Sequence, residues 1–323
     1  MFDGGYKKWR QLLVRCAFGF GHCISSAGCE GADPRSSVAR PSVRSRASPA
    51  AHARLDLFAL KPVENNLGWF AAVPQHAQSL WGSYLTAPAP ILSRGQADIY
   101  YIGADTKAAT YERGTAHEIR HTAGGRAFSP AGNGWDYNWE ANYQWGSFGN
   151  QSIRAWSAST ETGFTFHRVR FHPRPLLRAD VYSGDGNPAN RALGTFDALF
   201  PRGAYFTPKA VPFLAPQNLI DLHPVLQFQL RKNVTGAFAW NWYWRESTHD
   251  GVYAFGSGTL IDPADSSHAR YLGNQGDLEI HWAPLAHVII AFNIAGFEPG
   301  AFFKTVTYNA ATVDGNVGFT YHF

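Results

Sequence analysis

The sequence predicts an all-β chain that folds as an antiparallel transmembrane β-barrel, and three observations lead to this prediction. The segment 135–145, WDYNWEANYQW, alternates aromatic with polar residues, as in a strand whose successive side chains point to opposite faces. Similar alternation recurs in about twelve segments over roughly 270 residues. Tight turns and long connections separate these segments, which is typical of barrels with short turns at one end and long loops at the other.

Composition also favours a membrane barrel. Of the 323 residues, 15% are aromatic and 16% are charged, whereas about a quarter are charged in an ordinary domain. No run of about 18 apolar residues is present, so a transmembrane helix is not expected, but a barrel strand needs only about ten alternating residues. The alternative is a soluble β-sandwich whose strands pack around an aromatic core.

The first 53 residues differ from the rest, and we interpret them as a disordered or non-native head that precedes a barrel over residues 54–323. Residues 1–54 hold nine of the 28 basic and three of the 24 acidic residues, which leaves 19 basic and 21 acidic residues. The body therefore lacks the basic surplus of a nucleic-acid-binding protein. All three cysteines lie in the head, so no disulfide or thiolate metal site is expected in the body. A signal peptide is a second interpretation of the head.

Seven strands are expected in the first part of the body, each bounded by turn residues. The Gly146–Asn150 turn joins the central segment to the next strand, and a long connection is predicted at 105–114. The strands span Leu55–Leu60, Ser79–Leu85, Ala97–Ala104, Glu118–Arg126, Trp135–Trp145, Ser152–Ser159 and Leu176–Tyr182.

The connection Ser183–Pro216 is rich in Gly, Pro and Asn. Loops of this length are usually functional, and we interpret this one as a candidate gate that folds inward or over an opening. A solvated surface loop is the alternative.

The last third has the clearest alternation, with tight turns predicted at 232–233 and 284–285 and a long connection at 246–268. Its strands are expected at 226–231, 238–245, 277–282, 288–294 and 316–323. The chain ends in Phe323, with Tyr321, Phe319 and Val317 at every second position before it. This ending looks like the terminal strand that the outer-membrane barrel-assembly machinery recognises, so that machinery is an expected partner.

No catalytic motif is present. The sequence has no H-E-x-x-H, G-x-S-x-G, Walker or dinucleotide signature. Asp185 begins a Gly- and Asn-rich run, but Phe196 stands where an EF-hand needs Glu, so a turn is expected there. Asp136 and Glu140 on one strand face would stand about 13 Å apart, too far for a glycosidase pair. We therefore expect no enzyme, no cofactor and no metal site.

Several stretches together resemble the alginate export (AlgE-like) family of outer-membrane porins over about residues 55–323. They are SGDGNP at 183–188, TFDALFP at 195–201, WRESTHDGVY at 244–253, ARYLG at 269–273 and FEPGAF at 297–302. The resemblance implies an outer-membrane location in a Gram-negative bacterium and a single-chain antiparallel barrel of about eighteen strands. It also implies export of an anionic exopolysaccharide such as alginate, a pore lined by basic side chains, and no enzymatic activity or cofactor.

The chain departs from this pattern in strand number and in charge. It supplies about twelve strands, so either the barrel closes at a smaller size or the chain is an incomplete, non-functional barrel fragment. The polar faces carry five basic and six acidic residues. This balance does not favour the passage of a polyuronate, because a polyanion needs a lining with a net positive charge. The alternative is that opposite charges on neighbouring strands pair with each other across the barrel wall and have a structural role. The candidate lumen residues are Arg120, Arg126, Asp136, Glu140, Arg178, Asp180, Arg231 and Arg245.

The sequence thus predicts an outer-membrane channel, in contact with lipid, through which a saccharide or another small polar solute passes by diffusion. A soluble or secreted carbohydrate-binding β domain is one alternative, and it predicts that the Trp side chains cluster in a groove. A membrane-embedded hydrolase is another, and it requires a Ser/His or His/Glu cluster at the barrel rim.

Overall fold

The computed structural model describes residues 53–65, 72–74, 77–89, 95–132, 134–199, 214–255, 260–306 and 309–322. Parts of the sequence prediction lie outside these residues: the head up to residue 52, residues 200–213 of the candidate gate, residues 256–259 of the connection at 246–268, and the terminal Phe323. Within them, all twelve predicted strands are confirmed, and they follow one another in a single sheet. The chain is therefore all-β, with mostly antiparallel strands.

Most of the twelve strands are longer than the sequence pattern predicted, because pairing continues where the alternation of polar and apolar residues weakens. They are β1 (Arg54–Leu60), β4 (Gln78–Ala89), β5 (Gly95–Tyr111), β6 (Gly114–Gly132), β7 (Trp135–Phe148), β8 (Gln151–Phe164), β9 (Arg174–Tyr182), β11 (Leu219–Arg231), β12 (Val234–Trp244), β15 (Tyr271–Leu285), β16 (Val288–Pro299) and β17 (Thr312–Tyr321).

Short elements occupy the connections. The strand β10 (Ala192–Leu193) pairs in parallel with β8, and β13 (Val252–Tyr253) pairs with β14 (Leu260–Asp262). The remaining elements are β2 (Val63–Asn65), β3 (Ala72–Pro74), the 3-10 turn η2 (Ala264–Ser266) and the helix α2 (Ala301–Thr305). Among the described residues, no helix has the length and apolar character needed to cross a bilayer.

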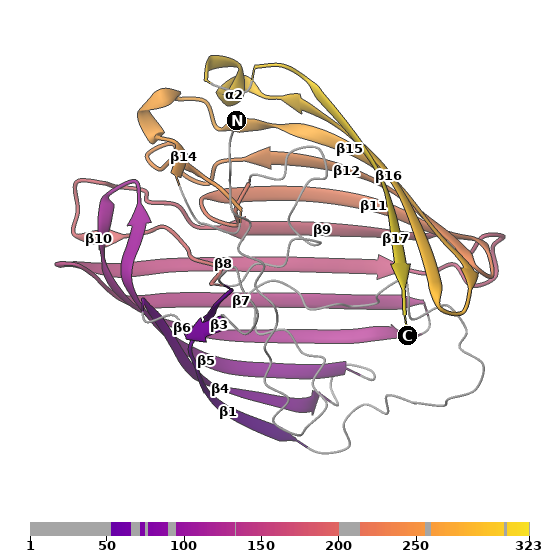
Figure 1. Ribbon diagram of the computed structural model, residues 1–323, viewed down its shortest axis with the longest axis horizontal. Helices are drawn as coiled ribbons and strands as arrows, with labels where there is room; N and C mark the ends of the chain where they lie inside the picture. Colours follow the sequence, from indigo (N-terminus) through magenta and orange to yellow (C-terminus); the bar gives the residue numbers. More distant parts are fainter. Residues whose placement is uncertain are drawn as a thin grey trace.

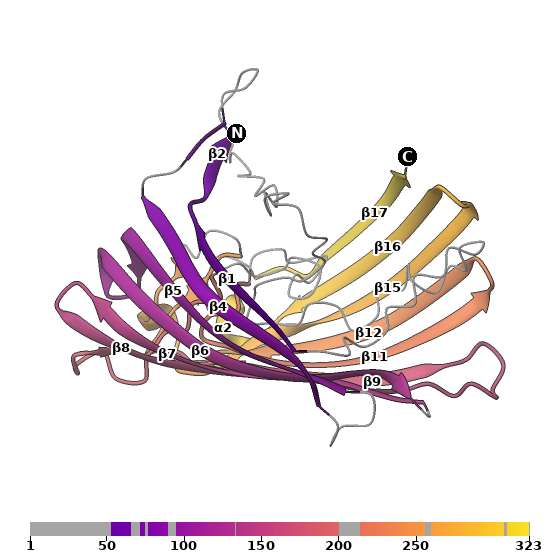
Figure 2. The ribbon, with the colours of Figure 1, turned by 90° about the horizontal axis from the view of Figure 1, so that it is seen from below.

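The sheet bends strongly but does not close (Figures 1 and 2). Each strand pairs with its neighbours along the chain, and β1 and β17 form the two edges. Figure 2 shows these edges standing apart above a concave face. An open edge of this kind agrees with the predicted incomplete barrel.

Two predicted connections are wrong. Residues 105–114 are not a long loop, because β5 and β6 continue across a bulge between Thr106 and Ala109 and meet at the two-residue turn Glu112–Arg113. The predicted turn at 284–285 is strand, since a register shift between Trp282 and Leu285 accommodates Pro284, and the turn follows at 286–287. Bulges tolerate residues that interrupt an alternating pattern.

The connections alternate between the two ends of the sheet because neighbouring strands are antiparallel. One end, called here the long-loop end, carries the connections at 112–113, 149–150, 183–218, 245–270 and 300–311. The other carries those at 133–134, 165–173, 232–233 and 286–287. The sequence predicted that the tight turn at 146–150 lies at the end opposite the long connections. This prediction is wrong, because the turn between β7 and β8 lies at the long-loop end.

The two faces of the sheet differ as the alternation predicted. In β7 four aromatic residues are exposed and four polar residues between them are buried, whereas Asp136 and Tyr137 are half-buried. The exposed residues are Trp135, Trp139, Tyr143 and Trp145, and the buried ones are Asn138, Glu140, Asn142 and Gln144. The indoles of Trp139, Trp145, Trp156 and Trp240 are 37–45% exposed, so they do not converge on a dry interior. This distribution agrees with an outer aromatic face in hydrocarbon and a polar inner face.

Candidate functional site: the concave lining and the inward-folded loops

A row of side chains in direct register crosses the concave face. Asp98 in β5 lies opposite Arg126 in β6, which lies opposite Glu140 in β7. The row continues through Ser159, Asp180, Asp221 and Tyr243, on β8, β9, β11 and β12. All seven residues are buried. We call them the lining row.

At one end of the row, two tyrosines and an arginine surround the carboxylates. Tyr84 and Tyr100 stack with ring centroids 5.2 Å apart, and the Tyr84 hydroxyl donates to Asp98 at 2.7 Å. The Tyr100 hydroxyl donates to Glu140. Arg126 donates to the Asn138 side chain at 2.7 Å and lies 3.8 Å from Asp98.

Arg120 also lies on this face, nearer the long-loop end, and it is fully buried. Its guanidinium donates twice to Glu118 at 3.0 Å, once to the Gln144 side chain at 2.7 Å and once to the Thr195 carbonyl oxygen at 3.1 Å. Arg120 therefore neutralises a carboxylate and holds the loop that contains Thr195.

A second cluster of charges includes a residue that the sequence prediction missed, Arg174. Its guanidinium donates to Asp136 at 2.9 Å and to the Gln227 side chain at 2.7 Å, and it lies 3.4 Å from Glu161. Arg178 donates to the other oxygen of Glu161 at 2.5 Å. Arg174 lies four residues before Arg178 in β9, so both side chains point to the same face of the sheet. The alternation, if extended from Arg178 toward the start of the strand, would have identified Arg174.

We expect Arg174→Met to lower the free energy of unfolding by about 3 kcal/mol, because the mostly buried carboxylate of Asp136 loses its guanidinium partner and Glu161 keeps only Arg178. Urea unfolding in detergent micelles measures this change. The control Arg154→Met removes an exposed charge from β8 and should change stability by no more than about 0.5 kcal/mol. Equal losses in both variants would contradict a pairing role for Arg174.

The eight predicted lumen residues do not all meet. Six lie on the concave face: Arg120, Arg126, Asp136, Glu140, Arg178 and Asp180. Arg231 is exposed at the last position of β11, at the end opposite the long loops. Arg245 is fully buried just beyond β12, where it donates to the carbonyl oxygens of Ala269 at 2.7 Å and Ser267 at 2.5 Å. A role for any of them in solute passage stays a prediction.

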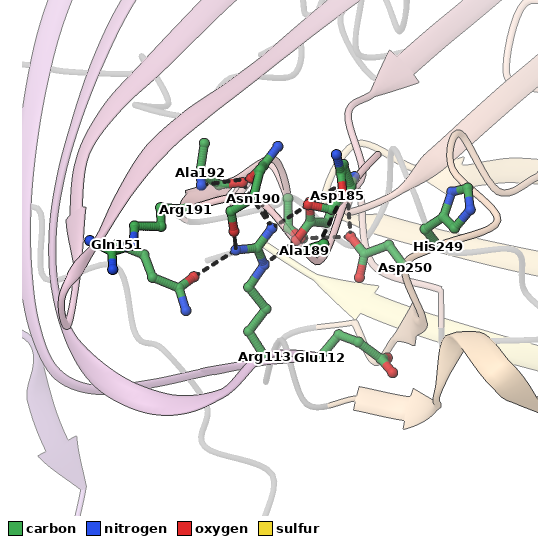
Figure 3. A network of polar contacts seen from close by, with 12 residues as sticks. Glu112, Arg113, Gln151, Asp185, Ala189, Asn190, Arg191, Ala192, His249 and Asp250 are labelled. Carbon is green, nitrogen blue, oxygen red and sulfur yellow. Dashed lines mark hydrogen bonds and ion pairs between the residues drawn. The ribbon is translucent and has the colours of Figure 1, made fainter.

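The loop after β9 folds onto the concave face, and Arg113 in the β5–β6 turn anchors it (Figure 3). The Arg113 guanidinium pairs with Asp185 and donates to the carbonyl oxygens of Asn187 at 2.9 Å and Asn190 at 2.8 Å. It also donates to the Ala192 carbonyl oxygen at 3.0 Å. One side chain thus holds four residues of the loop.

Asp185 forms a turn, as expected from its sequence. Its Oδ1 atom accepts a hydrogen bond from the Asn187 backbone N–H at 3.3 Å, while its other oxygen pairs with Arg113. Among the described residues, no three His, Cys, Asp or Glu side chains come close enough together to hold a metal ion.

Asp250 joins this loop to the connection between β12 and β15. Its fully buried carboxylate accepts hydrogen bonds from the Asp185 backbone N–H at 2.7 Å, Thr195 at 2.6 Å and Tyr253 at 2.5 Å. Burial raises the pKa of the Asp250 carboxyl above its ordinary value, and these hydrogen bonds act in the opposite direction. The two loops are therefore locked together through one carboxylate.

An apolar cluster lies next to these polar contacts. Phe196 and Leu214 from the loop after β9 pack with Tyr253 and with Phe302 and Phe303 of α2. The same cluster includes Ile153, Tyr182 and Tyr243 from the strands. The loops at this end thus have a hydrophobic core of their own, built against the sheet.

A family model matches the sequence over most of its length. The family model described as Alginate export matches residues 42–314, and no curated protein matches the chain. Among solved structures, OccK11 (OpdR) of Pseudomonas aeruginosa is 12% identical with a TM-score of 0.40, over 84% of this chain and 77% of that chain. The NanC porin is 6% identical with a TM-score of 0.36, over 76% and 94%. Because the family model covers most of its residues, the chain belongs to the alginate export family of Gram-negative outer-membrane proteins.

Proposed function

We propose that this chain forms a passive outer-membrane channel for saccharides and other small polar solutes. The observation that carries the proposal is the contrast between the two faces of one sheet. Outward-facing Trp139 and Trp240 are 45% and 39% exposed, whereas Glu140 and Asn241 beside them are 5% and 2% exposed on the opposite face. Such strands suit hydrocarbon on one side and a polar path on the other.

The pairing of the arginines favours uncharged solutes over a polyuronate such as alginate. Arg120, Arg126, Arg174 and Arg178 each contact a carboxylate on the concave face. A polyanion would have to compete with these carboxylates for every guanidinium, and the remaining acidic groups would repel it. A neutral sugar needs only hydrogen bonds, which the lining's Asn, Gln, Ser and Tyr side chains supply.

We propose that the described part of the Ser183–Pro216 connection narrows this path. Residues 183–199 contact Arg113 in the β5–β6 turn, Arg120 in β6 and Gln144 in β7. Contacts with a turn and two strands support a constriction rather than a solvated surface loop.

We further propose that the last strand directs assembly, with Phe323 as the residue that the barrel-assembly machinery binds. Val317, Phe319 and Tyr321 of β17 are 69%, 68% and 58% exposed, so the edge strand presents an alternating apolar row beside unpaired backbone groups.

Liposome swelling tests the channel. Vesicles that contain the refolded protein should swell in an isosmotic neutral disaccharide and much more slowly in an oligouronate of the same size. No swelling in any solute would contradict a channel. Faster swelling in the oligouronate would contradict selection for uncharged solutes.

A further inference from the structure

The end of the sheet opposite the long loops carries a cluster of positive charges. A hollow of about 530 Å³ lies there between the β8–β9 connection and the end of β11, and residues 167–172 and 229–232 line it. Arg168, Arg170 and Lys232 come from two separate connections, and all three are exposed. We call these three residues the turn-end cluster. Arg231, the last residue of β11, lines the same hollow.

No acidic residue balances this cluster locally. Residues 165–173 and 229–233 contain no Asp or Glu, and the described residues form no ion pair or hydrogen bond with the charged groups of the cluster. Asp136 and Glu161, on the strands that lead to this end, already pair with Arg174. The cluster is therefore free to bind an anion from outside the chain.

The backbone holds the β8–β9 connection in a defined shape. Phe171 and His172 have φ values of 68° and 43°, a conformation that residues other than glycine rarely adopt. Hydrogen bonds fix it, because the Gln229 N–H donates to the Phe171 carbonyl oxygen at 2.8 Å and the His172 N–H donates to that of Val169 at 3.0 Å. This shape places the charged residues of the connection beside the end of β11.

Exposed apolar side chains connect the cluster with the outer face of the sheet. The ring of Phe164 lies 5.0 Å from that of Trp135 and 4.8 Å from that of Phe166, centre to centre. Trp135 on the outer face is 60% exposed, and Phe166, Val169 and Phe171 in the connection are 43%, 48% and 41% exposed. Aromatic rings next to cationic side chains are typical of the level at which hydrocarbon meets lipid headgroups.

We propose that the turn-end cluster binds the phosphate groups of anionic phospholipids in the leaflet that surrounds this end of the sheet. The charges favour an anion, and basic side chains close to a membrane surface attract acidic lipids. The exposed rings beside the charges favour an anion that carries acyl chains over free phosphate. Lipid binding here requires a membrane-inserted sheet but not the passage of a solute.

Native mass spectrometry tests the lipid preference. The refolded full chain in detergent receives equal amounts of phosphatidylglycerol and phosphatidylcholine with the same acyl chains. We expect the protein to retain about ten times more phosphatidylglycerol than phosphatidylcholine. The triple variant Arg168→Gln, Arg170→Gln, Lys232→Gln should bring this ratio close to one.

The matched control is the triple variant Lys107→Gln, Arg191→Gln, Lys304→Gln. It removes the same charge from three exposed residues that lie in separate parts of the chain, so it should keep the ratio of the parent protein. The single reversal Lys232→Glu gives a readout that does not depend on the folding of a triple variant, and it should lower the ratio about threefold.

Three outcomes would overturn the lipid site. They are an unchanged ratio in the turn-end variants, equal losses in the two triple variants, and displacement of the bound lipid by an oligouronate at equal concentration. The last outcome would assign the cluster to an acidic solute instead. An intact preference for phosphatidylglycerol without liposome swelling would support the lipid site and contradict the channel alone.

Discussion

Replacement of Arg113 by Met is expected to raise the single-channel conductance severalfold and to produce frequent transitions between conductance levels. Arg113 pairs with Asp185 and donates to three backbone carbonyl groups between Asn187 and Ala192. Met retains much of the side-chain length but donates no hydrogen bond. The loop would then lose its main polar attachment to the β5–β6 turn, and the opening that it narrows would widen.

The matched control is Arg191→Met. Arg191 lies in the same loop, but its side chain is exposed, and Figure 3 shows it among the residues around Arg113. This control removes an equal charge without removing the anchor, so its conductance should match that of the parent protein. Equal behaviour of the two variants would show that Arg113 does not hold the loop in a position that limits flow.

Replacement of Trp139 by Arg is expected to lower the stability of the membrane-inserted sheet by about 2–4 kcal/mol, the cost of a cation on the lipid face near the bilayer midplane. Trp139 is 45% exposed on the outer face of β7, and its indole N–H donates to Thr162 on the neighbouring strand at 3.0 Å. Urea unfolding from lipid vesicles measures the loss.

The control for this prediction is Asn150→Arg, which places the same side chain in the exposed turn between β7 and β8. It should change stability by no more than about 0.5 kcal/mol. If Trp139→Arg were equally well tolerated, the aromatic face would not lie in hydrocarbon.

Much of the candidate site followed from the alternation of residues along the strands. The polar parity of the central segment correctly indicated that Asp136 and Glu140 share the inner face. The same alternation correctly placed Arg120, Arg126, Arg178 and Asp180 on the inner face. Successive side chains along a strand point to opposite faces, so the face of each residue can be predicted from its position in the strand.

Other parts of the site required partners that are distant in the sequence. Arg113 was predicted to lie in a long connection, whereas bulged pairing of β5 with β6 brings it to a tight turn beside Asp185, 72 residues away. Arg245 has the parity of the lining, but it lies one residue beyond β12, where the chain leaves the sheet and its guanidinium meets loop carbonyl groups. Neither outcome can be derived from residue types in one segment.

The sequence by itself determined the strand class, the number of long strands and which face of each strand is aromatic, because a period of two is a local property of extended backbone. Only the tertiary structure decided which carboxylate each arginine pairs with, which end of the sheet each turn occupies and how residues 183–199 fold onto the concave face. Those outcomes depend on register, bulges and contacts between distant segments, and their energies arise only when several strands are side by side.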